Sequence, residues 1–180
     1  MALKATIYKA ELQIADMDRN YYQEHILTLA RHPSETDERM MVRLLAFALH
    51  ANEALTFTKG LFDTDEPDLW QKDLTGAIDL WVEVGQPDEK RLMKACGRAE
   101  KVIVYSYSAT SNIWYKGIAN KLERAKNLTV INIPAEASAQ LQQLAKRNMQ
   151  LQCTIQDGQI WLTDSVETVL IERETFKGER

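Results

Sequence analysis

The sequence has few of the residues that form disulfides or bind zinc, with two cysteines and three histidines among 180 residues. Cys96 and Cys153 are far apart and have no metal-ligand spacing, so we expect free thiols, as in a protein of the reducing cytosol. The histidines are scattered, and none has a cysteine partner at a useful distance along the chain. These absences exclude a disulfide scaffold and a zinc motif.

Long apolar runs, nucleotide-binding loops and low-complexity segments are also missing from the sequence. No window approaches the ~18 consecutive apolar residues of a membrane span, and the N-terminal segment is too charged to be a signal peptide. There is no P-loop, no G-x-G-x-x-G loop and no Ser/His/Asp order typical of a hydrolase. We therefore expect a soluble, cytoplasmic protein with no membrane partner.

What the chain does have is an ordinary globular composition, with 45% hydrophobic and 27% charged residues. Its length predicts one domain over residues 1–180. The net charge of −4 does not attract nucleic acid, so such binding would need a local basic patch. Basic residues concentrate in the stretches 90–101 and 116–126. These are either solvated helix faces or phosphate contacts, and the sequence leaves both open.

Apolar periodicity and turn signals predict a mixed α/β fold. A hairpin is expected at 3–15 and 21–30, with a slip in phase near Lys9-Ala10, although a helix also fits 21–30. Asp157-Gly158 predicts a second hairpin, formed by 149–156 and 159–163. Further strands are expected at 55–59, 78–84, 101–107, 128–133 and 166–172. Helices are expected at 35–51, with Ser34 as N-cap, and at 87–98, 109–121 and 134–146.

The segment from Gly76 to Lys94 combines a strand bearing acids with a helix bearing cations. Alternation places Asp79, Trp81 and Glu83 on one face of the strand. The two acids lie about 13 Å apart at ~3.3 Å per residue, too far for one ion to bridge them. Any partner acid must therefore come from a neighbouring element.

Three segments of the chain closely resemble the bacterial YaeQ family: RHPSETDERMM at 31–41, IDLWVEVGQPDEKRLMKAC at 78–96 and TIQDGQIWL at 154–162. The resemblance runs essentially end to end. It implies a small cytoplasmic protein with a variant of the PD-(D/E)XK nuclease-like fold, a central mixed sheet flanked by helices, and extra hairpins near both termini. The predicted order of helix, strands, acid-bearing strand, helix and strand agrees with that core.

The resemblance also implies a divalent-metal site. In active nuclease-like proteins, acids on two neighbouring strands bind Mg²⁺ or Mn²⁺, a lysine two residues after the second acid acts on water, and a helix glutamate assists. Such hard cations prefer oxygen ligands and lower the pKa of bound water. Carried over, Glu83 matches the second acid, Asp68 or Asp79 the first, and Glu38 or Glu35 the helix glutamate.

The sequence departs from the nuclease pattern at the lysine position, which holds Gly85. Lys90 or Lys94 on the following helix could supply the cation instead, and Gln86 could bind a water without deprotonating it. Trp70, near the acidic loop at 63–68, could stack a base.

Two functions remain open from the sequence. One is a metal-dependent phosphodiesterase or nuclease, with catalytic residues Glu83, Asp79, Glu38, Lys90 and Lys94, and metal ligands Glu83, Asp79 and Asp68. The other is a non-catalytic module of the same fold that binds nucleic acid or a protein partner. In a purely structural interpretation, Asp79 and Glu83 form an exposed polar strand face or pair with Arg39 and Arg43, and Asp68 is a turn residue.

Overall fold

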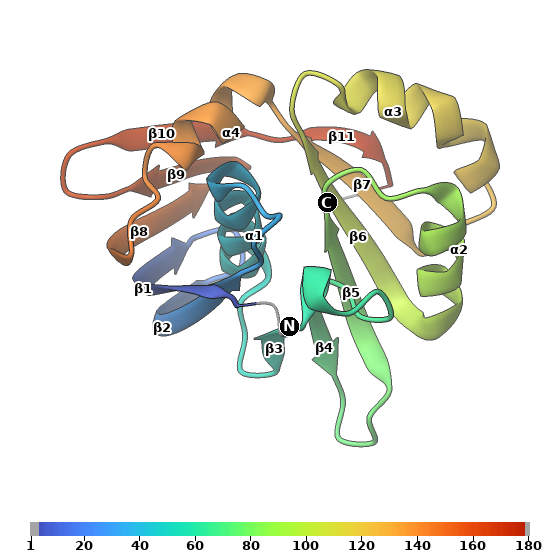
Figure 1. The fold of residues 1–180 in the computed structure, drawn as a ribbon, viewed down its shortest axis with the longest axis horizontal. Helices are drawn as coiled ribbons and strands as arrows, with labels where there is room; N and C mark the ends of the chain where they lie inside the picture. The colour runs from blue at the N-terminus through green and yellow to red at the C-terminus, as the bar shows by residue number, and fades with distance from the viewer. Residues whose placement is uncertain (1–3, 179–180) are drawn as a thin grey trace.

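A computed structural model describes residues 4–178 as two mixed β-sheets and four α-helices (Figure 1). The predicted mixed α/β class is therefore confirmed. None of the described helices is long and apolar enough to cross a membrane.

The five-stranded sheet joins the two predicted hairpins. Its strand order is β10-β9-β8-β1-β2, and β1 runs parallel to β8. The strands are β1 (Thr6–Asp16), β2 (Tyr21–Arg31), β8 (Asn148–Gln156), β9 (Gln159–Thr163) and β10 (Thr168–Glu172). The strand expected at 21–30 is confirmed, and Leu3 lies outside the described residues.

The phase slip expected near Lys9-Ala10 is wrong. The pairing of β1 with β2 is continuous from Thr6 to Asp16, and the buried positions alternate without interruption. Ala10 is therefore buried, while Ile7 is 40% exposed. The alternation of the sheet places Ile7 outside, although its side chain is apolar.

The six-stranded sheet holds the acid-bearing strand near its centre, in the order β11-β7-β6-β5-β4-β3. The strands are β3 (Leu55–Phe57), β4 (Leu69–Lys72), β5 (Ile78–Val84), β6 (Ala99–Tyr107), β7 (Leu128–Ile133) and β11 (Glu174–Lys177). Strands β5, β6 and β7 are parallel, and β4 is antiparallel to β5. Part of the charged tail expected at 176–180 is thus edge strand β11.

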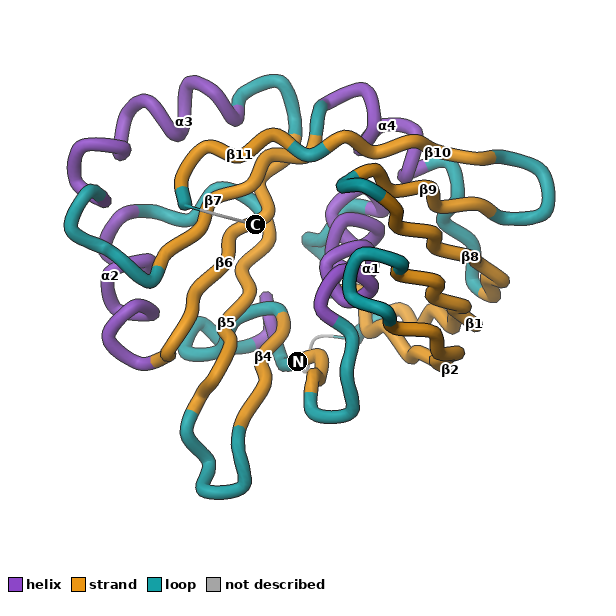
Figure 2. The backbone as a smooth tube through the Cα atoms, turned by 180° about the vertical axis from the view of Figure 1, so that it is seen from behind, coloured by secondary structure: helices purple, strands orange, loops and turns teal. Residues whose placement is uncertain are grey.

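Helix α1 (Asp37–His50) lies between the two sheets, where residues 40–49 are all buried (Figures 1 and 2). Its N-cap is Thr36, whose side chain accepts from the Arg39 amide, and not the expected Ser34. Ser34 instead hydrogen-bonds to His32.

Helices α2 (Glu89–Arg98) and α3 (Ser111–Ile118) cover the other side of the six-stranded sheet (Figure 1). Short 3₁₀ helices, η1 (Gly60–Phe62) and η2 (Ala119–Leu122), precede β4 and extend α3. Helix α4 (Ala135–Gln142) is shorter than predicted. One apolar core joins α1 with both sheets, and a second lies under α2. Strand β5 contributes to both cores, because its alternate side chains face opposite sides of the sheet.

Candidate functional site

A cavity of about 410 Å³ opens where β5 leads into α2. Gly85 allows this turn, because its φ of +113° lies in a region that side chains rarely adopt. Asp88 then caps α2 by accepting from the Arg91 amide at 2.8 Å. The cavity is lined by Arg39, Gly60, Leu61, Thr64, Asp68, Glu83, Val84, Gly85, Gln86, Pro87, Arg91 and Tyr107.

Glu83 lies against an arginine. Its Oε1 accepts from Arg91 Nε and from Trp81 Nε1, both at 2.9 Å, and its side chain is 5% exposed. Arg91 also donates to the carbonyl oxygens of Thr64 and Glu66, at 2.6 and 2.9 Å. The guanidinium therefore joins the acidic loop to the floor of the cavity.

Burial raises the pKa of Glu83 above its ordinary value of 4.5, and the negative charge of Asp68 raises it further. Hydrogen bonding and the positive charge of Arg91 oppose this shift, as does the Trp81 hydrogen bond. The net direction shows that Arg91 only partly compensates the ionised form.

Asp68 is held from two sides at the start of β4. Its Oδ1 accepts from Arg39 Nη2 and its Oδ2 from the Val84 amide, both at 2.8 Å. Arg39 also donates to Glu35 Oε2 at 2.6 Å and to the Val84 carbonyl at 3.1 Å. Burial acts to lower the pKa of Arg39, but Asp68 and Glu35 raise it overall, so this guanidinium stays charged.

Glu35 completes the network from the segment before α1. It is 4% exposed and forms a bidentate pair with Arg43, at 2.8 Å from Oε1 to Nη2 and 3.1 Å from Oε2 to Nε. The network, defined as Glu35, Asp68, Glu83, Arg39, Arg43 and Arg91, thus contains three carboxylates and three guanidinium groups. Its formal charge is balanced.

This arrangement does not fit a divalent cation. Both oxygens of Asp68 already accept hydrogen bonds, and residues 4–178 contain no cluster of three or more His, Cys, Asp or Glu that could hold a metal. An ion bound here would compete with Arg39 and Arg91 for carboxylates whose charge they already compensate, and it would bring further positive charge beside both guanidinium groups.

The other predicted residues are divided between the cavity and more distant places. Gln86 lines the cavity and donates to Thr110 Oγ1 at 2.8 Å. Glu38 lies at the contact of α1 with α4, where its Oε2 accepts from Ser138 at 2.8 Å. Lys94 lies 3.7 Å from Asp65, with both side chains largely exposed.

Asp79, Lys90 and Trp70 are not among the residues that line the cavity. Trp70 packs edge-on against Trp81, with ring centroids 6.2 Å apart, and Lys72 lies over its ring at 3.9 Å. One face of the indole is thus already covered, which leaves less room for a base to stack.

The sequence indicated Asp68 and Glu83 as site residues, but the expected pairing of Glu83 with Arg39 or Arg43 is wrong, because Glu83 pairs with Arg91. The sequence places Arg43 one helical turn after Arg39 on the same face, whereas Glu35 contacts both arginines from the segment before α1. Arg91 was noted only as one of a stretch of basic residues. No spacing along the chain indicated the contact of Arg91 with Glu83, because it depends on how α2 packs beside β5.

The comparisons with known proteins agree with one another. The model of the family described as YaeQ protein matches residues 1–173. The uncharacterised YaeQ proteins of Salmonella typhi and Escherichia coli K12 are 49% and 50% identical to this chain, over 96% and 91% of both chains.

Two solved structures have the same fold. The crystal structure of the YaeQ protein from Xanthomonas axonopodis pv. citri matches with a TM-score of 0.94 at 47% identity, covering 98% of this chain and 100% of that one. The YaeQ structure from Pseudomonas syringae matches with a TM-score of 0.93 at 36% identity, covering 97% of each chain. The chain therefore belongs to the YaeQ family.

Proposed function

We propose that this chain is a non-catalytic module with a variant PD-(D/E)XK nuclease-like fold, and that it binds nucleic acid without a metal ion. The order α1, β3, β4, β5, α2, β6 and the position of two carboxylates at the junction of β4 and β5 support the fold assignment. The observation that supports the loss of catalysis is that each of the three network carboxylates pairs with a guanidinium group.

The cost of metal binding follows from the burial of the network. Arg39 and Asp68 are both largely buried, and removing one partner from such a pair costs roughly 3–5 kcal/mol, with a smaller cost for the partly exposed Arg91. A cation at Asp68 and Glu83 would separate Arg91 or Arg39 from its carboxylate, and it would bring two positive charges into a balanced cluster. The network is therefore better suited to joining β4, β5, α1 and α2 than to activating water.

The charge distribution supports nucleic acid as the partner. Residues 86–127, here called the basic layer, contain nine Lys and Arg against four Asp and Glu, whereas the rest of the chain contains 13 against 22. The basic layer is thus formally +5 on a chain of −4. It includes α2, α3 and η2, which cover one side of the six-stranded sheet (Figure 1).

Part of the basic layer is available to phosphate groups. Five of its cations, on α2, α3, η2 and the loop after η2, are exposed and form no ion pair within residues 4–178: Lys90, Lys116, Lys121, Arg124 and Lys126. The Asn127 side chain donates to the carbonyl oxygens of Cys96 and Ala99, both at 3.0 Å, so the loop after η2 is tied to the end of α2. Contacts from such cations to a phosphate backbone release counterions, which makes binding dependent on salt.

Fluorescence anisotropy with labelled single-stranded and duplex DNA tests the binding. We expect the variant K121Q/R124Q/K126Q to bind more weakly than wild type and to lose about one unit of salt slope per phosphate contact. The matched control K9Q/K59Q/K146Q removes the same charge from exposed positions outside the basic layer. No binding by the wild type, or equal weakening in both variants, would contradict a specific role for this layer.

Incubation of the same DNA with Mn²⁺ tests the absence of catalysis. We expect the wild type to cleave no more than Glu83→Ala purified identically. Cleavage that is lost only in Glu83→Ala would contradict the proposal and support the metal-dependent phosphodiesterase instead.

A further inference from the structure

Strand β2 is a long sheet edge without the features that usually protect one. It has 11 residues, whereas the other edge strands, β10, β11 and β3, have five, four and three. Its sequence, YYQEHILTLAR, contains no proline and no lysine, and its pairing with β1 has no bulge. Natural proteins usually blunt such edges, because unpaired backbone groups recruit another strand.

The direction of the backbone groups of β2 follows from its neighbours. The Lys9 amide donates a hydrogen bond to the carbonyl oxygen of Arg147, the residue before β8. The backbone N–H and C=O groups of the odd-numbered residues of β1 therefore point toward β8, and those of the even-numbered residues point toward β2. Because Ala10 pairs with Leu27, the backbone groups of the odd-numbered residues of β2 point toward β1. The backbone groups of the even-numbered residues of β2 therefore point to the free edge of the sheet.

Four residues present free backbone groups at this edge. The carbonyl of Ala30 accepts from Arg43 Nη2 at 3.2 Å. No hydrogen bond within residues 4–178 uses the outward groups of Tyr22, Glu24, Ile26 and Thr28. Tyr22 is 58% exposed and Ile26 78% exposed on the outer face.

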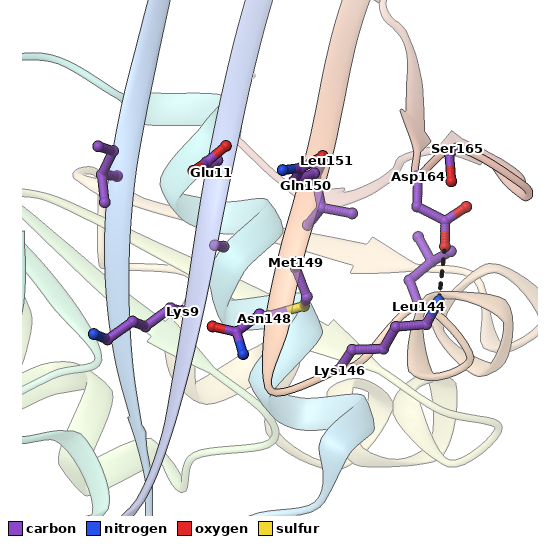
Figure 3. A pocket seen from close by; sticks show the side chains of 12 residues that line it. Lys9, Glu11, Leu144, Lys146, Asn148, Met149, Gln150, Leu151, Asp164 and Ser165 are labelled. Atoms are coloured by element: carbon purple, nitrogen blue, oxygen red, sulfur yellow. Dashed lines mark ion pairs between the residues drawn. The ribbon is translucent and has the colours of Figure 1, made fainter.

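The outer face itself is open beside this edge. Lys9, Glu11 and Gln150 lie on this face and line a cavity of about 380 Å³ (Figure 3). The exposed residues of β1 and β8 alternate along it. Figures 1 and 2 both show β2 at the margin of the molecule.

We infer that a second copy of this chain pairs with β2 in antiparallel orientation, on a two-fold axis at His25. The four free positions are symmetric about His25, so this register pairs Tyr22 with the partner's Thr28 and Glu24 with the partner's Ile26. It uses each free backbone group, leaves the Arg43–Ala30 bond intact and places no two like charges opposite each other. The two five-stranded sheets become one continuous sheet.

Sedimentation equilibrium over about two decades of micromolar concentration tests this pairing. We expect wild type to approach twice the monomer mass, and Ile26→Glu to associate at least about tenfold more weakly, because the new carboxylate faces Glu24 of the other copy. Adding Glu24→Lys to Ile26→Glu should restore association, since each lysine then faces a glutamate. Leu170→Glu, a similar change on edge strand β10, is the matched control and should leave association unchanged.

Three results would overturn the inference. The wild type could stay monomeric, or Ile26→Glu could leave the dimer intact. The third is that adding Glu24→Lys to Ile26→Glu does not restore association. Hydrogen exchange gives a second readout, because the amides of Tyr22, Glu24, Ile26 and Thr28 should become protected as concentration rises.

Discussion

At the scale of single residues, the site depends on how buried carboxylates are compensated. Asp68 has a charged donor on one oxygen and a backbone amide on the other. Glu83 has one guanidinium and one indole on the same oxygen. Burial and the negative charge of Asp68 raise the pKa of Glu83, and its contacts with Arg91 and Trp81 only partly oppose this shift.

Removal of Arg91 should destabilise the fold, because it leaves Glu83 buried without its cation. We expect Arg91→Ala to lower the free energy of unfolding by about 1–3 kcal/mol, less than for a fully buried pair because Arg91 is partly exposed. Urea unfolding measures it, with exposed Arg124→Ala as control. The double variant Arg91→Ala/Glu83→Gln should lose less than the sum of the single changes. Strict additivity would show that the two side chains do not interact.

The raised pKa of Glu83 also predicts a dependence of stability on pH. An acid whose folded pKa lies above its unfolded value favours folding while protonated, and this contribution is lost as pH rises through the folded pKa. The glutamine of the Glu83→Gln variant stays neutral at every pH, so this variant has no such contribution to lose. The unfolding free energy of Glu83→Gln relative to wild type should therefore increase as pH rises from about 4.5 upward. A relative stability that falls over this range would mean that Arg91 stabilises the ionised form more than burial opposes it.

At the scale of elements, local sequence signals predicted most of the strands. Which strands lie next to one another in the sheets is decided by tertiary contacts. The alternation around Glu83 and the Asp157-Gly158 turn were sufficient for β5 and for the β8–β9 hairpin. The sequence favours Ser34 as the N-cap of α1, whereas the structure has Thr36, because the helix begins two residues later than expected, at Asp37. The proximity of Asp68 to Glu83 depends on the antiparallel pairing of β4 with β5 across the turn from Asp73 to Gly76, and the sequence did not predict β4 as a strand.

Two glycines near α2 should respond oppositely to alanine. Gly85 has a φ of +113° and Gly97 has a helical backbone, and neither has an atom within 4 Å of the place of a Cβ. We expect Gly85→Ala to destabilise by about 1–3 kcal/mol through backbone strain, and Gly97→Ala to stabilise by about 0.5–1 kcal/mol. Thermal unfolding of both variants measures the difference. Equal effects would mean that the turn after β5 adapts without cost.

At the scale of the whole molecule, charge is separated between two regions. The basic layer is formally +5 and the remainder of the chain −9, while the network at the cavity is balanced. Composition alone predicted neither feature, because a net charge of −4 averages over both. The sequence located the basic stretches, but whether α2 and the loop after η2 lie together depended on contacts such as that of Asn127 with Cys96.

Calorimetric titration of Mg²⁺ and Mn²⁺ into the wild type and Glu83→Ala tests the central claim most directly. Since guanidinium groups already neutralise the carboxylates at this cavity, we predict no saturable binding to either protein at millimolar metal. A single saturable site in the wild type that Glu83→Ala abolishes would contradict this account and assign the cavity to metal-dependent chemistry.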